Sequence, residues 1–467
     1  MDSPILRQMF VASAPQLAAI SIGGVVGFPN VILEQFKAND TTIQVDIHMA
    51  SWIGSTHGLA GIPSIAMPTI MQWKGRKLSF LLCCFLIITG WILTYISKNV
   101  MTIIIAECFH GLASNSLIIV SFYTISEMIA PKYRMISMSF YAINQTFGMA
   151  VIGIIARYLH WKTVTIIMSV PIIVAFVTSC AWPESPSWLA YKGEYTKCEK
   201  AFKWLRGTDD ISQKELKELL NAQRGSVKPK ASARVLLKQI ISRDFYVPCF
   251  HTFVILCAFY WSGIMVIFIY GPDILQRATS NSAAAKYGMI SINIILYIGI
   301  LTTTFLLKNF SNKTVLLFSG ITSTVFLVSA SIVTYLQSIG LLPSNSMLSL
   351  YCVVGFMLFM SLGMTTVAFV IPAELMPVKH RGLGGAVYVI LLCLLHASSL
   401  KISPYLMLYV GLWGTFLVYA VNALVCMVIV WRCVPETKGK TLQEIEDYYN
   451  YGSFVRNPIE NGVNELL

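Results

Sequence analysis

The sequence predicts an all-α membrane protein in which twelve transmembrane helices form two six-helix bundles. Composition gives the first observation, because the 467 residues are 56% hydrophobic and only 12% charged, whereas about a quarter of the residues in soluble domains are charged. The second observation is that apolar windows of about twenty residues, each long enough to cross a hydrocarbon core of about 30 Å, recur along the whole chain. A polar segment in the middle divides these windows into two sets of six.

The windows follow one another with short connections inside each set. The first set covers residues 10–33, 51–71, 78–97, 101–125, 136–157 and 162–182, and the second covers 247–271, 284–307, 314–336, 347–371, 384–403 and 406–431. In the polar segment between the sets, the apolar spacing over 195–206 predicts a helix. Ser212 with Glu215 fits a capping box that would open another helix.

The net charge of +12 agrees with a membrane topology in which both termini lie inside. In that topology 27 of the 34 Lys and Arg residues fall in cytoplasmic segments, as the positive-inside rule requires. The basic charge therefore needs no nucleic-acid partner. We predict an N-terminal bundle at 1–182, a cytoplasmic helical linker at 183–246, a C-terminal bundle at 247–432 and a cytoplasmic tail at 433–467. Asn39 opens a glycosylation sequon in the outer loop after the first span.

Charged motifs lie at the predicted cytoplasmic ends of the spans. They are Gly75-Arg76-Lys77, Glu127 with Pro131 and Arg134, Pro183 to Leu189, Glu374 with Pro377, Arg381 and Gly382, and Pro435 to Leu442. Carboxylates and guanidiniums at the ends of two bundles can pair across the cleft between them, with a bidentate geometry that makes each pair specific. The alternative is that these charges only orient the spans, although a positive-inside bias needs no Glu.

These motifs, in this order and over nearly the whole chain, resemble those of the sugar porters of the major facilitator superfamily, and among them the insect facilitated trehalose transporters. The resemblance implies alternating access to a substrate site between the bundles near mid-membrane. It also implies an inner gate formed by Gly75, Arg76, Lys77, Glu127, Arg134, Glu184, Glu374, Arg381 and Glu436. Where the family has Gly-Arg-Arg between spans 8 and 9, this chain has Ser311-Asn312-Lys313. We therefore expect a weaker inner gate, or one biased toward opening.

The predicted substrate site departs further from the family. Sugar porters carry Gln-Gln-x-Ser-Gly-Ile-Asn on span 7, where this chain reads Phe259-Tyr260-Trp261-Ser262-Gly263-Ile264-Met265. The span 10 pattern Gly-Pro-x-Pro-Trp becomes Thr365 to Phe369, which loses two helix-breaking prolines, and the span 8 Asn aligns with Leu296. By resemblance, the substrate-binding residues are Gln145, Tyr260, Ser262, Met265, Phe369 and Leu392.

Most of these replacements remove amides that bind sugar hydroxyls. Each buried polar group left unpaired costs about 1–3 kcal/mol, so the loss of several amides disfavours an ordinary hexose. An aromatic, Met-lined cleft suits flat or apolar molecules. The alternative is that the aromatic residues of span 7 only pack against other helices or face lipid.

Glu107 occupies the place where relatives carry an Arg within span 4. His110 lies one turn further on, so the two side chains can share a face and a proton. Ionisable groups within spans are candidates for function, and the pair is either a possible proton relay or a buried pair that serves packing. The span 1 Asp of proton-coupled relatives aligns with Pro29, so uniport is the default. We expect His251 and His396 to be satisfied helix residues.

No phosphate loop, metal-ligand cluster or nucleophile with a nearby base is evident in the sequence. We therefore expect no enzyme activity, no cofactor and no metal. The favoured function is facilitative transport of a sugar, either trehalose or a hexose-like sugar, across the plasma membrane. Its partners are a small-molecule solute and the lipid bilayer. Two alternatives are a carrier of a more lipophilic solute such as a glycoside, and a non-transporting sensor on the same scaffold.

Overall fold

The computed structural model describes residues 3–36, 43–224, 242–375, 381–438, 440, 444–445 and 448–449. All regular elements in these ranges are helices, and eleven of them are long and apolar enough to cross a membrane. In the N-terminal half these are α1 (Pro4–Gln35), α4 (Arg76–Ile96), α5 (Val100–Met128), α6 (Pro131–Ile155) and α7 (Trp161–Cys180). In the C-terminal half they are the segment Arg243–Thr279, α14 (Ser282–Asn309), α15 (Asn312–Ser338), the segment Leu348–Pro372, α18 (Arg381–Tyr409) and α19 (Gly411–Cys433).

The second predicted span is not one helix. It consists of α2 (Ile47–Ala60), the short 3-10 helix η1 (Ile62–Ala66) and α3 (Met67–Lys74) in succession. Pro63 and Pro68 explain the interruptions, because a proline has no backbone N–H and its ring clashes with the carbonyl of the preceding turn. Both prolines stand in the first turn of the helix that follows, where the ring is tolerated.

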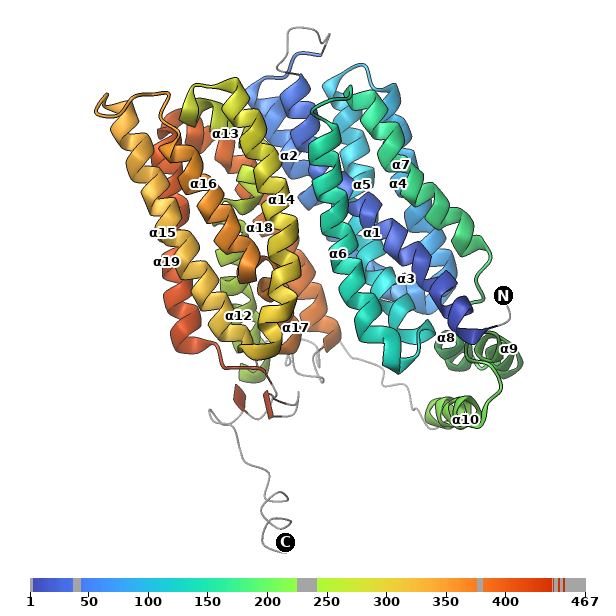
Figure 1. Cartoon of the computed structure of the whole chain (residues 1–467). Helices are drawn as coiled ribbons and strands as arrows, with labels where there is room; N and C mark the ends of the chain where they lie inside the picture. Colours follow the sequence, from blue (N-terminus) through green and yellow to red (C-terminus); the bar gives the residue numbers. More distant parts are fainter. Residues whose placement is uncertain are drawn as a thin grey trace, which may run out of the picture.

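The helices pack as two bundles. In the first bundle α1 packs on α6 and α7, and α4 packs on α5 and α7. In the second bundle α15 packs on α16 (Leu348–Phe359) and α19. Figure 1 shows the two groups side by side. The contacts between them run through α2 with α18, α6 with α14, and α1 with α13 (Ile264–Thr279). The predicted all-α, two-bundle membrane fold is confirmed.

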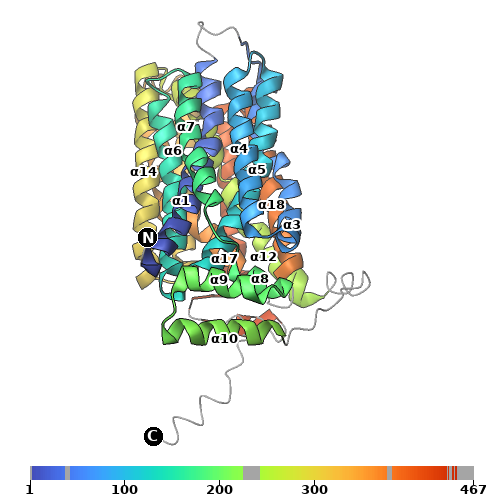
Figure 2. The ribbon, with the colours of Figure 1, turned by 90° about the vertical axis from the view of Figure 1, so that its right-hand side faces the viewer.

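Three linker helices lie across one end of the N-terminal bundle. They are α8 (Pro186–Lys192), α9 (Tyr195–Arg206) and α10 (Asp210–Arg224), and Figure 2 shows them as a layer at that end. The start of α1 is bound to α9, since Arg7 Nη1 donates to Trp204 O at 3.1 Å and Gln8 Nε2 donates to Leu205 O at 3.2 Å. We call this end of the molecule the linker side and the opposite end the far side.

The expected capping box at Ser212 is wrong, because α10 begins two residues earlier, at Asp210. The N–H of Gln213 donates to Asp209 O at 3.0 Å, which makes Asp209 the residue that precedes the first turn. The Ser212 hydroxyl donates instead to Arg206 O at 3.1 Å, and Glu215 pairs with the Arg206 guanidinium at 3.3 Å. These two contacts join α9 to α10.

Candidate functional site

The seventh span is broken where the sequence carries Ser262-Gly263. Helix α12 (Arg243–Tyr260) ends before this pair and α13 begins after it. Gly263 has φ +87°, and a Cβ there would lie 2.5 Å from Cδ2 of Tyr419. Both facts require glycine at the break. The Ser262 hydroxyl donates to Phe259 O at 2.7 Å, so in this conformation it stabilises the backbone at the break.

Side chains of neighbouring helices satisfy the backbone beside this break. Asn422 of α19 donates from Nδ2 to Cys257 O at 3.3 Å and to Trp261 O at 3.1 Å. The indole of Trp261 donates to Ser398 Oγ on α18 at 3.2 Å. Non-helical backbone at membrane depth is tolerated only where protein or water satisfies it, and here protein side chains do so. The break is therefore a stabilised part of the C-terminal bundle.

Three helices contribute to an aromatic cluster that we define as Phe259, Tyr260, Phe369 and His396. The Phe259 ring lies edge-on to Phe369 and to Tyr260, with centroid distances of 5.0 Å in both pairs. The Tyr260 ring lies 5.2 Å from the imidazole of His396. The structure thus brings together two predicted site residues, Tyr260 and Phe369. The expectation that His396 is satisfied is wrong, because its buried Nε2 has no hydrogen-bond partner.

The remaining predicted site residues stand on both bundles. Gln145 is partly buried on α6 of the N-terminal bundle, while Met265 on α13 and Leu392 on α18 are partly buried in the C-terminal bundle. Helix α1 approaches α6 closely at this level, since a Cβ on Gly23 would lie 1.9 Å from the Gln145 backbone oxygen. A solute that contacts Gln145 together with Met265 or Leu392 would therefore lie between the two bundles.

The tenth span departs from α-helical geometry although its prolines are missing. A π-helical segment, Met360–Met364, separates α16 from α17 (Thr365–Leu375). The Thr303 hydroxyl of α14 donates to Ser361 O at 2.9 Å within this segment. Segments of π-helix are frequent at functional sites, and this one precedes Phe369 by five residues. The span therefore keeps an irregular region by another means than proline.

Asn293 on α14 is a residue that the sequence comparison missed. It is 1% exposed, and neither polar atom of its amide has a hydrogen-bond partner. It faces α6 of the other bundle, where a Cβ on Gly153 would lie 2.1 Å from its Nδ2. The family pattern placed the lost span 8 amide at Leu296, one turn later and on the same helix face. An amide is therefore still present at the bundle interface.

The predicted inner-gate residues of the N-terminal half form one network. Arg76 Nη2 contacts Glu127 Oε1 at 2.7 Å. Glu184 Oε1 accepts from the backbone N–H of Arg76 at 2.9 Å and of Lys77 at 3.2 Å, although burial raises the pKa of its carboxyl. Lys77 Nζ donates to two carbonyls at the end of the sixth span. Gly75 has φ +95°, and a Cβ there would lie 2.2 Å from Glu184 Oε2.

The C-terminal half repeats part of this geometry. Asn312 Nδ2 donates to Glu374 Oε2 at 3.2 Å, in the place of the Arg76 contact with Glu127. Lys313 Nζ donates to Trp431 O at 2.9 Å and Val434 O at 2.7 Å, as Lys77 does at the sixth span. Glu436 accepts from the N–H groups of the two residues that follow it, both at 3.1 Å. Each half thus has its own set of contacts.

All these gate contacts lie within one bundle. Arg134 belongs to the same end, and its buried Nε has no hydrogen-bond partner. The side chain of Arg381 and the whole of Asn39 lie outside the described residues. The described part of the chain therefore shows no ion pair between the bundles at the gate residues.

The hydrogen bonds between the bundles lie toward the far side. They are Asn30 Nδ2 to Phe268 O at 2.7 Å, Tyr270 OH to Ala50 O at 3.3 Å, Lys401 Nζ to Ser51 Oγ at 2.9 Å, and His48 Nδ1 with Tyr405 OH at 2.8 Å. The ammonium of Lys401 also lies 3.6 Å from the Trp52 ring centroid. Across the described ranges, the bundles are thus fastened on the far side and not by the gate residues.

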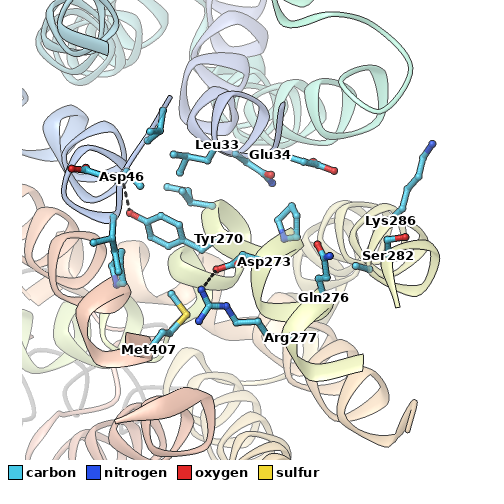
Figure 3. A pocket seen from close by; sticks show the side chains of 18 residues that line it. Leu33, Glu34, Asp46, Tyr270, Asp273, Gln276, Arg277, Ser282, Lys286 and Met407 are labelled. Atoms are coloured by element: carbon cyan, nitrogen blue, oxygen red, sulfur yellow. Dashed lines mark hydrogen bonds and ion pairs between the residues drawn. The ribbon is translucent and has the colours of Figure 1, made fainter. Parts of the chain in front are cut away.

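A pocket of about 290 Å³ opens between the bundles on the far side. Figure 3 shows it between α1, α2, α13, α14 and α18, with Glu34, Asp273 and Lys286 around it. Glu34 forms an ion pair with Arg157, and Asp273 pairs with Arg277 at 3.2 Å. None of the residues of the aromatic cluster lines this pocket.

Comparison with known proteins identifies the family. The model of the family described as "Sugar (and other) transporter" matches residues 10–449. The chain belongs to the sugar transporter family. The facilitated trehalose transporter Tret1 of Apis mellifera ligustica is 24% identical over 447 residues, which cover 94% of this chain and 87% of that protein. The sugar transporter ERD6-like 6 of Arabidopsis thaliana is 25% identical over 396 residues, which cover 84% and 80%.

Solved structures agree with this family in fold. The inward-open xylose transporter XylE of E. coli superposes with a TM-score of 0.74 at 15% identity, over 95% of this chain and 99% of that one. The proton:xylose symporter XylE bound to 6-bromo-6-deoxy-D-glucose gives a TM-score of 0.70 at 16% identity, over 96% and 99%. The resemblance to sugar porters is confirmed, and this sugar transporter family member is a carrier rather than an enzyme.

This sugar transporter family member also contains a buried carboxylate cluster, which we define as His57, Glu107 and His110. Glu107 is completely buried; its Oε1 lies 3.4 Å from His110 Nδ1 and its Oε2 lies 3.8 Å from His57 Nδ1. The structure therefore places the two residues of the predicted relay together. Sequence reasoning missed His57, which stands on α2, although an ionisable residue within a span was itself a signal.

Proposed function

We propose that this protein is a facilitative carrier that moves a sugar across the plasma membrane by alternating access. The observation that carries the proposal is the position of the contacts between the bundles. Hydrogen bonds join the bundles toward the far side, while the described gate residues make their contacts within a bundle. That is the arrangement expected of a carrier that is closed on one side and open to the other.

We further propose that the linker side faces the cytoplasm. The Lys and Arg residues concentrate in the linker and in the loops of the same side, and cytoplasmic loops collect these residues. Both termini are then cytoplasmic, and Asn39 stands outside, where its sequon is open to glycosylation. The gate residues would then control access from the cytoplasm. Among them are Glu127, Arg134, Glu374, Arg381 and Glu436.

The favoured solute is trehalose or a hexose-like sugar, because the insect relatives carry the name of trehalose transporters. Gln145 and Asn293 would supply amides to its hydroxyls, each from one bundle. The aromatic cluster supports a second candidate, a glycoside with an apolar portion, because the rings of Phe259, Tyr260 and Phe369 adjoin one another where the family carries amides. Apolar pockets with a few placed polar groups suit such a ligand.

Uptake into proteoliposomes tests these candidates. The purified carrier would be supplied with labelled trehalose, labelled glucose and a panel of aryl glycosides. Saturable trehalose or glucose uptake supports the sugar carrier, and uptake confined to the glycosides supports the second candidate. Ligand binding without any uptake would contradict transport and leave the sensor.

Substitution of Tyr260 tests the role of the aromatic cluster. Tyr260→Gln places an amide where sugar porters have one, and we expect the ratio of sugar to glycoside uptake to rise about three- to tenfold, since one hydrogen bond contributes about 1 kcal/mol. Tyr351→Gln is the matched control, because that tyrosine is 67% exposed on the lipid-facing surface. Equal changes in the two variants would contradict a substrate contact at Tyr260.

A further inference from the structure

The buried carboxylate cluster contains one acidic side chain and two basic ones. Glu107 is one carboxylate between two imidazoles, those of His57 and His110. A buried charge is costly unless it is paired, so the cluster is neutral either with a protonated Glu107 between two neutral imidazoles or with an ionised Glu107 beside one imidazolium. In either arrangement the cluster can bind one more proton, and the buried His110 Nε2 has no hydrogen-bond partner in the described structure.

Two glycines leave the space that these imidazole rings and their helices occupy. A Cβ on Gly90 of α4 would lie 2.4 Å from Cδ2 of His110, and a Cβ on Gly111 of α5 would lie 2.2 Å from the backbone oxygen of His57. The His57 Nε2 also lies 3.2 Å from the Ser114 hydroxyl. The imidazoles thus occupy fitted spaces between α2, α4 and α5.

The cluster continues across the bundle interface. The rings of His57, on the N-terminal bundle, and His396, on the C-terminal bundle, have centroids 6.1 Å apart. The helices are close at this point, since a Cβ on Gly58 would lie 3.0 Å from the Ala397 nitrogen. His396 in turn lies 5.2 Å from Tyr260, a predicted substrate residue. A row of side chains thus joins the cluster to the substrate site.

We propose that His57, Glu107, His110 and His396 form a proton-binding site that holds fewer protons when the far side is closed. Two imidazolium ions on His57 and His396 would repel each other across the closed interface. Opening of the far side separates the rings and lets His396 Nε2 take a proton from water, and closing returns that proton to water. The proposal deepens the proposed function, since it rests on the two alternating states of the carrier.

Other ionisable groups line the same interface. Besides the four proposed residues they are His48, Tyr260, Tyr270, Cys393 and Lys401 on α2, α12, α13 and α18, and Glu34, Asp46, Asp273, Arg277 and Lys286 around the far-side pocket. Glu107 is the acidic residue of the cluster and has two imidazoles beside it, whereas Glu34 pairs with Arg157 and Asp273 pairs with Arg277 at the pocket. Among the described residues, no group of three His, Cys, Asp or Glu side chains is arranged to hold a metal ion. The proton is therefore the ligand that suits the cluster.

The distance between the far-side ends of the bundles tests the proposal without any solute. Spin labels would be placed on Lys98→Cys and Asn345→Cys, which are exposed on the two bundles, after the exposed Cys108, Cys180 and Cys433 are changed to Ser. In nanodiscs, we expect the long-distance population to rise several-fold between about pH 8 and about pH 5.5, with a ceiling of about tenfold per pH unit for each linked proton.

Histidine variants show which side chains cause the pH-dependent change in distance. His396→Gln should remove the shift, and His57→Gln should reduce it by at least half. His251→Gln should retain it, since His251 is a buried imidazole elsewhere, bonded to Tyr449 at 2.9 Å. His48→Gln should also retain it, although His48 bonds across the interface.

Three results would overturn the proposal. They are a wild-type protein with no pH-dependent distance, a shift that survives in both cluster variants, and a shift that only His48→Gln removes. Because the measurement needs no transported solute, a failed uptake assay and a failed pH response are separate results.

Discussion

At the scale of single residues, the inner-gate residues of the two halves form corresponding contacts with partly different side chains. Lys77 and Lys313 both bind carbonyls at the end of the last span of their half. Arg76 contacts Glu127 with a guanidinium at 2.7 Å, whereas Asn312 contacts Glu374 with a neutral amide at 3.2 Å. Both contacts have a carboxylate acceptor, but only the Arg76 contact also has a charged donor, which adds the attraction between opposite charges. This exchange in the C-terminal half is a local reason for the weaker gate that the sequence predicts, which stays a prediction.

Gly75→Ala gives a prediction at this scale. Gly75 has φ +95° and ψ 172°, a conformation available essentially to glycine alone, and its new Cβ would meet Glu184 Oε2 at 2.2 Å. We expect a loss of about 1–3 kcal/mol in stability, seen as a lower melting temperature in detergent. Gly193→Ala is the control, because Gly193 has φ +80° but nothing within 4 Å of a Cβ. An equal loss in both variants would show that the Glu184 contact contributes nothing.

At the scale of helices, the irregular segments coincide with the predicted site. The seventh span breaks at Gly263, and the tenth span carries a π-helical segment shortly before Phe369. The loss of two helix-breaking prolines from the tenth span favours, by itself, the alternative of a non-transporting sensor. The π-helical segment removes that argument for the sensor, because the span keeps its irregular region without proline.

Asn422→Leu tests the break in the seventh span. The substitution leaves Trp261 O without the amide that donates to it at 3.1 Å, whereas Cys257 O keeps the N–H of Trp261 at 2.9 Å. Each buried carbonyl left unpaired costs about 1–3 kcal/mol, so we expect a lower melting temperature and at least a severalfold slower uptake. Val421→Leu, at a lipid-facing position 53% exposed, should change neither. Normal uptake by Asn422→Leu would mean that the break plays no part in transport.

At the scale of the whole molecule, the sequence predicted the fold better than the site. Composition and window length predict the spans, because crossing a membrane requires about twenty apolar residues wherever they occur. The division of the second span followed from Pro63 and Pro68, which the hydropathy windows do not weigh. The cluster of His57 with Glu107 depends on packing between helices fifty residues apart, and no spacing rule reports such a contact.

Closure of the far side is a property of both bundles together, and Lys401→Met tests it. Lys401 donates to Ser51 Oγ at 2.9 Å and lies 3.6 Å from the Trp52 ring centroid, so one side chain of α18 holds two residues of α2. Methionine is close to lysine in volume but has no charge. We expect the closed state to lose about 1–2 kcal/mol, a change of about five- to thirtyfold in the ratio of the two populations, measured with the spin labels at positions 98 and 345. Lys162→Met, which removes an ammonium over Trp161 and Tyr95 within one bundle, is the control and should leave the ratio unchanged. If both variants behave as the wild type, the far side is held closed by helix packing and not by Lys401.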